Sequence, residues 1–455
     1  MQRRKRMTKK KRTVIATILL LTAFTALLNQ TVMITALPVM ARTLHISLNL
    51  AQWLTAGYVL MIGLTTPLSA NLAEKFSSRQ LFLGIVSLFI VGTIIGPLTN
   101  SFYIILLGRL LQAMAGGVLI TFVMVSMLAI YPPQKRGTVM GFVSLVISAG
   151  PAIGPSLSGL VINYLSWKYL FYLVLVIMIC SLLAGFLWLP NYSEKQDVKI
   201  DFKSVISSIV GMGLVFSSIT VFEQNFNVAL AMLVIGLAIT AYFLRRQTVL
   251  DKPLLNIRLF KRPSFLLMII ATMLVFAILM GTEALIPIFI ENVIHQSSLL
   301  AGLAMLPGAV ANAIMAPLVG RYYDGHGPKL PILSGLILLI LSSIPFQTMN
   351  EQTSVMWIIT IYIVRMLGIS MIMSVTTTES LKGLATSQIG YGTAWNNTLR
   401  QISGSASNTI LIVIASLPAS LMVGFHVAMS IIFGATFLLL LVCSLYLFKF
   451  YTTEG

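Results

Sequence analysis

Long apolar runs separated by polar segments dominate the pattern of this chain. Fourteen of these runs have approximately the length, about 20 residues, that an α-helix needs to cross a bilayer core of about 30 Å. The run at 391–417 is the most polar of the fourteen. The pattern therefore predicts spanning helices at roughly 13–37, 50–70, 81–98, 103–129, 139–162, 169–189, 205–222, 228–244, 265–290, 299–319, 330–347, 355–376, 391–417 and 421–448.

The composition agrees with a polytopic membrane protein. Hydrophobic residues make up 57% of the 455 residues and charged residues only 9%, against about 25% charged residues in a soluble globular domain. The apolar run after the basic N-terminus is longer than the roughly 7 to 15 residues of a signal peptide's apolar region, so we expect it to be the first spanning helix. Cys180 and Cys443 lie in apolar runs, where a cysteine is typically a small core residue.

The basic residues orient the predicted helices. With the N-terminus in the cytoplasm, 25 of the 30 Lys and Arg lie inside and two, Arg42 and Lys168, lie outside. The other three, Arg109, Arg365 and Arg400, lie within spans; Arg400 could also snorkel to the inner surface. The bias matches the positive-inside rule, and anionic lipid headgroups would neutralise the inner charges. We therefore expect a cell-membrane protein with both termini cytoplasmic, and the net charge of +18 gives no reason to expect a nucleic-acid partner.

Two loops repeat one pattern of charges. ANLAEKFSSRQ follows the second predicted helix and GRYYDGHGPKL follows the tenth. In each loop an acid precedes a base by five residues, Glu74 before Arg79 and Asp324 before Lys329, and the acids are 250 residues apart. Each pair could latch helix ends in one conformational state, or it could be a solvated topology signal. The repeat predicts two six-helix bundles, 13–200 and 263–448, with two inserted helices and a linker at 201–262, and tails at 1–12 and 449–455.

Two further stretches strengthen the pattern. GRLLQAMAGG in the fourth predicted span places Arg109 three residues before Gln112, and SAGPAIGPSLSG lies in the fifth. Together with the loops, these stretches resemble the major facilitator superfamily, and the fourteen spans resemble its branch of drug:proton antiporters. The first stretch is similar to the signature R-x-x-Q-G. The second is similar to the antiporter motif G-P-x-x-G-P-x-x-G-G, carried here by Gly150, Pro151, Gly154, Pro155 and Gly159.

The resemblance implies an all-α polytopic protein with the major facilitator fold, acting as a monomeric transporter without a cofactor. It places Arg109 and Gln112 at a substrate cavity or proton relay. Helix 1 departs from the branch, because LNQTVMITALP carries Asn29 where an aspartate is usual. In the fifth span, two prolines would kink the helix and small residues would let a neighbouring helix approach. That arrangement suits either a gate or simple packing.

One carboxylate lies well inside a predicted span. It is Glu283, in ILMGTEALIPIF, whereas the other 11 acidic residues fall in predicted loops, tails or helix ends. An ionisable residue inside a membrane is expensive and usually functional. We therefore predict that Glu283 is the proton-linked carboxylate; a neutral structural acid bonded to a neighbouring helix is the alternative.

These features favour one function over two others. We expect a secondary transporter that exports lipophilic drugs or toxic small molecules by proton antiport with alternating access, and so confers antibiotic resistance. A proton-coupled uptake symporter for a small nutrient is the runner-up. A membrane enzyme or receptor would need a soluble domain, but the longest inner connection has only about 20 residues. The sequence has no G-x-x-x-x-G-K-[ST] phosphate loop, so we expect no ATP drive within this chain.

Overall fold

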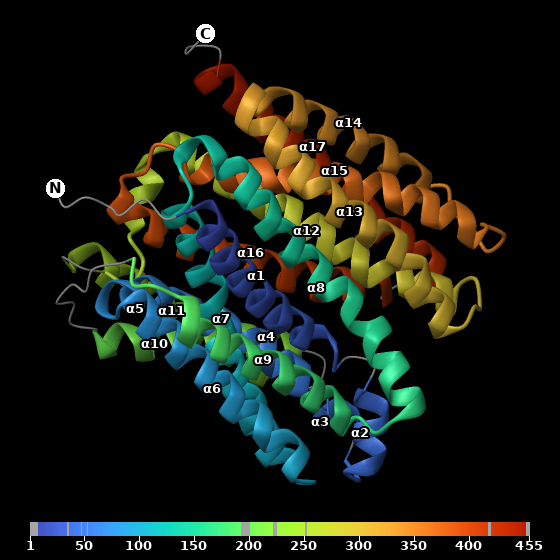
Figure 1. Ribbon diagram of the computed structural model, residues 1–455. Helices are drawn as coiled ribbons and strands as arrows, with labels where there is room; N and C mark the ends of the chain where they lie inside the picture. Colours follow the sequence, from blue (N-terminus) through green and yellow to red (C-terminus); the bar gives the residue numbers. More distant parts are fainter. Residues whose placement is uncertain are drawn as a thin grey trace.

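The computed structural model describes residues 8–33, 36–46, 48–51, 53–192, 201–221, 225–250, 253–416 and 420–451. All regular secondary structure in these ranges is helical. The long helices run along one common direction, and the first and last helices of the chain start and end at the same end of the molecule (Figure 1).

The N-terminal bundle is built from helices before residue 190. They are α1 (Lys9–Thr31), α4 (Trp53–Thr65), α5 (Ser69–Lys75), α6 (Ser78–Leu98), α7 (Phe102–Ile130), α8 (Arg136–Tyr164) and α9 (Lys168–Trp188). Within it α7 packs on α4 and α6, and α1 packs on α8 and α9. Two short helices, α2 (Leu37–Thr43) and α3 (Leu48–Ala51), cover the end where α1 leads into α4 (Figure 1).

Proline residues explain where this bundle differs from the predicted spans. The first predicted helix extended to residue 37, but α1 ends at Thr31 and α2 starts separately, with a proline in its first turn. The second span is broken into α4, the 3₁₀ turn Thr66–Leu68 and α5. Pro67 lies in that turn, and a proline removes a backbone donor and clashes with the preceding helical turn.

Two helices follow the N-terminal bundle and pack mainly on each other. They are α10 (Phe202–Val221) and α11 (Phe226–Val249), and α10 also contacts α4. Asp201, just before α10, accepts hydrogen bonds from Nε and Nη2 of Arg246 on α11 at 2.6 and 3.0 Å. This charge-assisted pair joins the two helices at one end. A short 3₁₀ helix, Ile257–Lys261, leads on to the next bundle.

The C-terminal bundle consists of six helices. They are α12 (Pro263–Asn292), α13 (Ser298–His326), α14 (Lys329–Phe346), α15 (Val355–Leu381), α16 (Thr386–Ser416) and α17 (Leu421–Tyr446), which continues as a π-helical turn, Leu447–Tyr451. In this bundle α12 packs on α15, α16 and α17, and α15 also packs on α13 and α14.

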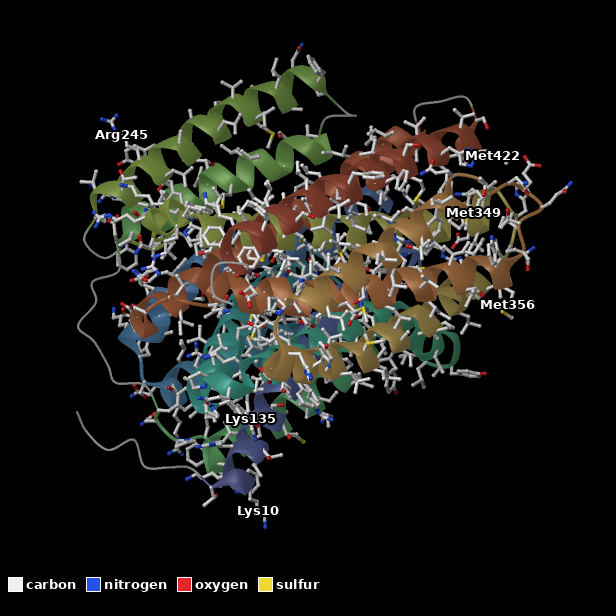
Figure 2. The ribbon with its side chains drawn as sticks, turned by 90° about the horizontal axis from the view of Figure 1, so that it is seen from above. Lys10, Lys135, Arg245, Met349, Met356 and Met422 are labelled. Carbon is white, nitrogen blue, oxygen red and sulfur yellow. The ribbon has the colours of Figure 1, made fainter. Side chains whose placement is uncertain are left out.

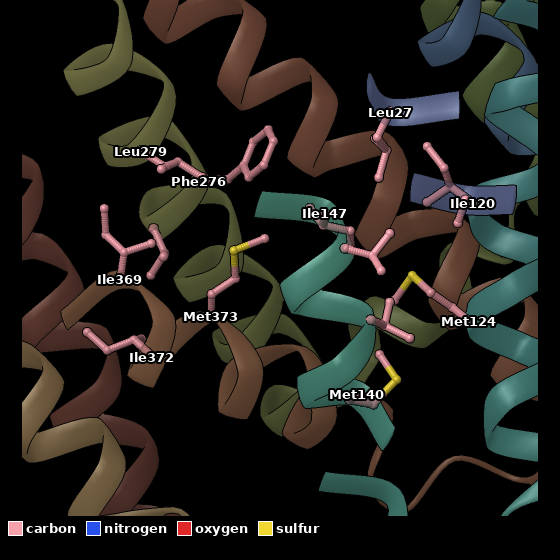
Figure 3. Packing of buried hydrophobic residues seen from close by; sticks show 14 of the residues in the cluster. Leu27, Ile120, Met124, Met140, Ile147, Phe276, Leu279, Ile369, Ile372 and Met373 are labelled. Atoms are coloured by element: carbon pink, nitrogen blue, oxygen red, sulfur yellow. The ribbon is translucent and has the colours of Figure 1, made fainter. Parts of the chain in front are cut away.

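The two bundles meet along α8 and α13 and, on another side, where α16 contacts α4, α5 and α7. Apolar side chains fill the centre of the molecule, as Figure 3 shows. Its labelled residues come from both bundles and are all buried: Leu27, Ile120, Met124, Met140 and Ile147 from the first, and Phe276, Leu279, Ile369, Ile372 and Met373 from the second.

Eleven helices of the described residues are long and apolar enough to cross a membrane. The predicted spans at 139–162, 205–222 and 391–417 correspond to α8, α10 and α16, which are not among the eleven. Phe202–Val215 of α10 forms a shorter apolar stretch, and α16 carries the polar run Asn396, Asn397, Thr398 and Arg400. The predicted count of fourteen is therefore not confirmed.

The two ends of the molecule differ in chemistry. Lys10, Lys135 and Arg245 lie at one end, and Met349, Met356 and Met422 lie at the other (Figure 2). We call these the basic end and the far end. Because α12 and α16 start at the basic end, residues late in these two helices lie towards the far end.

Candidate functional site

A buried polar network occupies the interior of the N-terminal bundle. Arg109 of α7 donates from Nε to the carbonyl oxygen of Leu54 at 3.1 Å, and from Nη1 to the carbonyl oxygen of Asn29 at 3.0 Å. Nη1 also lies 3.2 Å from Oε1 of Gln112. Asn29 donates to that same Oε1 at 3.0 Å, and Gln112 donates to Thr93 at 2.8 Å. Three predicted site residues, Asn29, Arg109 and Gln112, are thus brought together from two helices.

Tyr58 completes this network. Its ring lies under the Arg109 guanidinium, 4.1 Å from ring centroid to Cζ, and its hydroxyl accepts from Asn29 at 3.3 Å and donates to the carbonyl oxygen of Ala26 at 3.1 Å. Arg109, Tyr58, Asn29 and Gln112 are all 0% exposed. Sequence analysis missed Tyr58, since a tyrosine in an apolar run carries no signal of its own. This arginine is surrounded by carbonyl and amide oxygens and by an aromatic face. None of the described carboxylates forms an ion pair with it.

Two glycines allow the network to form. A Cβ atom on Gly92 of α6 would lie 2.5 Å from the carbonyl oxygen of Gly108 and 2.9 Å from the backbone nitrogen of Gln112. A Cβ on Gly108 of α7 would in turn lie 2.7 Å from the carbonyl oxygen of Gly92. No side chain larger than hydrogen fits at such distances, so these glycines set the close approach of α6 and α7 that brings Thr93 to Gln112.

Glu283 lies in the other bundle, away from this network. It is the twenty-first of the 30 residues of α12, past the middle of the helix towards the far end. Its side chain is partly buried, and the described residues provide it with no hydrogen bond or salt bridge. The structure therefore does not give it the bonded neighbour that a structural acid would need.

A polar neighbour of Glu283 comes from α15. Tyr362 lies close enough to interact electrostatically with both Glu283 and Arg365. Both α15 residues are buried, and Nη1 of Arg365 lies 3.4 Å from the Ser343 hydroxyl. Its Nε and Nη2 have no hydrogen-bond partner among the residues that the structure describes. A carboxyl group, a phenol and an arginine with spare donors thus lie within one region of the C-terminal bundle.

The loop acids reach across to the opposite bundle. Asp324, at the basic end of α13, accepts hydrogen bonds from the backbone nitrogens of Gly137 and Thr138, both at 2.7 Å, and from the Thr138 hydroxyl at 2.5 Å. These nitrogens lie in the first turn of α8, where backbone N–H groups have no partner within the helix. Asp324 therefore caps α8 from the other bundle, in place of the predicted pairing with Lys329.

The first copy of the loop makes a comparable contact. Glu74, in the last turn of α5, accepts a hydrogen bond from the Tyr391 hydroxyl near the start of α16. Arg79 instead donates to the carbonyl oxygen of Phe186 and stacks on that residue's ring, with Cζ 4.9 Å from the centroid. Both acids of the repeat thus join the bundles at the basic end, and Arg79 ties α6 to α9 within one bundle.

The glycines of the fifth predicted span differ in what they contact. A Cβ on Gly150 of α8 would lie 2.8 Å from Cβ of Leu27, and one on Gly154 would overlap the hydroxyl of Thr31, both residues of α1. A Cβ on Gly159 would meet nothing within 4 Å. Pro151 and Pro155 lie within α8, which is continuous from Arg136 to Tyr164. The motif therefore packs against α1 inside its own bundle.

Two other glycines of α8 face the C-terminal bundle. A Cβ on Gly137 would lie 2.7 Å from the carbonyl oxygen of Gly320, and one on Gly141 would lie 2.5 Å from that of Ala316. No local sequence pattern marks these positions. Their contacts show that α8 and α13 approach backbone to backbone at the basic end of the bundle interface.

A buried carboxylate that sequence analysis assigned to a helix end lies nearby. Glu379 of α15 is 2% exposed, and it accepts hydrogen bonds from the hydroxyls of Tyr323 on α13, at 2.5 Å, and Tyr446 on α17. Nζ of Lys382 lies 3.8 Å from Glu379 Oε1. The tyrosines come from helices more than 50 residues away, which is why no local pattern marks this acid.

A cavity of about 220 Å³ lies at the basic end between the bundles. The N-terminal bundle contributes Leu128, Pro133 and Arg136 to its lining, and the C-terminal bundle contributes Tyr323, Lys382 and Ile389 among others. It lies beside the Asp324 cap on α8, so opening of the bundles at this end would enlarge it.

Two helical bundles that face each other, with charged residues buried in apolar helices, are typical of membrane transporters. The sequence matches the Major Facilitator Superfamily over residues 19–408, and the chain belongs to that family. It is 39% identical to the MFS-type transporter YcnB of Bacillus subtilis over 408 residues, covering 89% of this chain and 86% of that protein. It is 34% identical over 400 residues to the lincomycin resistance protein LmrB of Listeria innocua, covering 87% and 85%.

The chain is also similar to a more distant relative and to a solved structure. The multidrug export protein EmrB of Haemophilus influenzae is 25% identical over 399 residues, covering 86% of this chain and 78% of that one. The crystal structure of the human organic anion transporter MFSD10 superposes with a TM-score of 0.70 at 14% identity, covering 94% of this chain and 99% of that chain. That likeness shows the shared fold.

Proposed function

We propose that this transporter exports lipophilic drugs or other toxic small molecules from the cytoplasm in exchange for protons. Relatives named as lincomycin resistance and multidrug export proteins support the class of substrate. The observation that carries the proton coupling is Glu283, a carboxyl group inside α12 that has no bonded partner among the described residues.

The surroundings of Glu283 suit proton exchange. An apolar environment favours the neutral form of a carboxyl group, whereas a nearby cation favours the carboxylate. Arg365 has two unpaired nitrogens and is linked to Glu283 through Tyr362. A shift of α15 relative to α12 during alternating access would change the distance between Arg365 and Glu283, and so would drive proton uptake in one state and release in the other.

The contacts at the basic end support a state that is closed on that side. We assign the basic end to the cytoplasm because Lys10, Lys135 and Arg245 lie there (Figure 2). All fourteen long segments would then cross the membrane, and both termini would lie in the cytoplasm. Asp324 on α8 and Glu74 with Tyr391 would hold the bundles together, and breaking these contacts would open the central region to the cytoplasm.

Glu283→Gln tests the proposal, because it keeps the shape of the side chain but removes its titration. The purified variant in proteoliposomes with an imposed pH gradient should still bind a fluorescent efflux dye, yet lose proton-driven accumulation. Glu291→Gln, the same substitution eight residues further along α12, is the matched control and should transport like the parent. Parent-like accumulation by Glu283→Gln, with unchanged pH dependence, would refute a coupling role for this carboxyl group.

A further inference from the structure

Arg400 lies at the middle of the molecule. It is the fifteenth of the 31 residues of α16 and is only 3% exposed, so it does not reach the inner surface as a snorkelling side chain would. Its Nη2 donates to Oδ1 of Asn397 at 2.9 Å, and its Cζ lies 5.2 Å from the ring centroid of Phe276 on α12. Transporters of this kind bind their substrates near the midplane, between the two repeats.

A hydrogen-bond chain from Arg400 crosses the bundle interface. Nδ2 of Asn397 donates to the hydroxyl of Thr121 on α7 at 2.9 Å, and both of these residues are buried. Seven residues later, on the same side of α16, the Ser407 hydroxyl donates to the carbonyl oxygen of Ala277 on α12 at 2.7 Å. Arg400 therefore lies on the face of α16 that meets both the opposite bundle and the aromatic ring of Phe276.

The guanidinium of Arg400 lacks partners for much of its hydrogen-bonding capacity. Its Nε and Nη1 are buried without any hydrogen-bond partner in the described part of the chain. The salt bridges of the described residues join Arg246 to Asp201 and Lys382 to Glu379, so no carboxylate there neutralises Arg400. Buried charged donors of this kind are costly unless something pairs with them.

The helices as a group contain more buried cations than acids that could neutralise them. Arg109, Arg365 and Arg400 are buried, each with at least one unpaired nitrogen. The long helices of the C-terminal bundle also carry acids, but Asp324 caps α8, Glu291 lies in the last turn of α12, and Glu379 is already bonded to two tyrosines and close to a lysine. Glu283 remains. A water-poor interior with an excess of cations attracts anions.

We propose that Arg400 is the docking point for an acidic group of the transported molecule, so that amphipathic organic anions are substrates of this protein. This inference rests on the proposed export function and deepens it. The acidic group accepts hydrogen bonds from the free nitrogens of Arg400, and the apolar part of the molecule packs on Phe276, which Figure 3 shows on α12 near the centre.

The same geometry couples loading to the opening of the bundles. Separation of α16 from α7 breaks the hydrogen bond between Asn397 and Thr121. That step frees the amide of Asn397 to turn from Thr121 towards the bound molecule, and it opens a path to Arg400 from the basic end. The anion then takes the place of the hydrogen bond that joined the two bundles.

Two probes of the same shape test this inference. Radiolabelled 1-naphthaleneacetate carries a carboxylate, and 1-naphthaleneacetamide carries a neutral amide instead. Equilibrium binding to the purified full-length protein in nanodiscs should favour the carboxylate by about tenfold or more, because charge-assisted hydrogen bonds are the stronger ones. Arg400→Gln should abolish this preference while leaving amide binding within about twofold, whereas Arg400→Lys should keep part of it.

Arg245→Gln is the matched control. It removes an arginine at the basic end of α11, far from the centre (Figure 2), and should leave both affinities unchanged. A parent protein that binds both probes equally, or does not bind the carboxylate, overturns the inference whether or not Arg400→Gln folds. Equal loss of both probes in a folded Arg400→Gln variant also overturns it, because that result assigns Arg400 a structural role.

The result for the anion site can be distinguished from the result for the proposed proton coupling. Proton-driven efflux of the dye is measured on the same Arg400 and Glu283 variants. If the parent shows no charge preference but Glu283→Gln abolishes proton-driven efflux, only the anion site is refuted. If Glu283→Gln transports normally while Arg400→Gln loses the preference, the anion site stands and the proposed coupling fails.

Discussion

The cap that Asp324 places on α8 gives a sharp test of how the bundles are held together. Asp324→Asn keeps the size of the side chain but removes its negative charge and one of its two acceptor oxygens. In the structure these oxygens accept three hydrogen bonds of 2.5 to 2.7 Å from Gly137 and Thr138. The variant should therefore open the basic end more often than the parent.

The expected size of the effect follows from the bonds lost. A hydrogen bond to a charged group contributes about 1.5–3 kcal/mol, and a negative charge at a helix N-terminus adds about 0.3–1 kcal/mol. Asp324 is only partly buried, so solvent reduces both contributions. We expect a net shift of about 1–3 kcal/mol in favour of the open state, which is about 5- to 150-fold in the equilibrium constant.

Cysteine labelling measures this shift. Ile389 lines the cavity at the basic end and is 6% exposed, so a cysteine there reacts with a maleimide only when the bundles open. The background protein carries Ala at Cys180 and Cys443, and nanodiscs expose both ends to the reagent. With opening rare in the parent, Asp324→Asn should raise the labelling rate by about 5- to 150-fold, in proportion to the open fraction.

Lys329→Gln separates this explanation from the loop pairing expected from the sequence. The lysine lies at the first position of α14 and is exposed, so the structure predicts a labelling rate close to that of the parent. Labelling of Asp324→Asn at the parent rate would refute the cap as a latch. An equal effect of Lys329→Gln would show that the acid–base pair within the loop, rather than the contact with α8, holds the bundles.

Three other predictions follow from particular contacts. Gly154→Leu should impair efflux and lower the melting temperature without preventing membrane insertion, because its side chain overlaps Thr31, whereas Gly159→Leu should be tolerated; equal behaviour of the two would contradict the packing. The Arg246 guanidinium holds the pKa of Asp201 down at about 2, so the stability that this ion pair adds is present above the usual aspartate pKa and is lost as pH falls towards 2. The difference in melting temperature between parent and Arg246→Gln should therefore shrink on acidification, and a constant difference would argue against the pair. A C-terminal reporter that is active only in the cytoplasm should be active, and activity of an outside-only reporter would refute the proposed topology.

Sequence motifs selected residues that lie together in the fold, but they did not reveal all of the partners of these residues. Arg109, Gln112 and Asn29 were selected from short signatures, and they do bond to one another. The motif spacing could not reveal that Tyr58 supplies the aromatic face below the arginine. That contact depends on how α4 and α7 pack, which is a property of the whole bundle.

The charged residues also differ in how much the sequence reveals about them. Glu283 stands out in the sequence because an acid inside an apolar run violates the hydrophobic pattern. Glu379 is only 2% exposed, yet it looked like an ordinary acid at a helix end, since its tyrosine partners lie on α13 and α17. Arg400 was open to two interpretations until the structure placed it against Phe276 and beside Asn397.

The sequence by itself determined where most helices lie. It also predicted which way they cross the membrane and that the chain has two related halves. These properties follow from hydropathy and charge along a continuous stretch, because each helix satisfies its own backbone hydrogen bonds in lipid. Only the tertiary structure decided which side chains meet: that Asp324 caps a helix 186 or more residues earlier, that α8 packs through glycines on both α1 and α13, and that Arg400 faces the bundle interface with no counter-charge from the described residues. Such contacts depend on the packing of helices distant in sequence, and hydrophobicity along the chain does not record them.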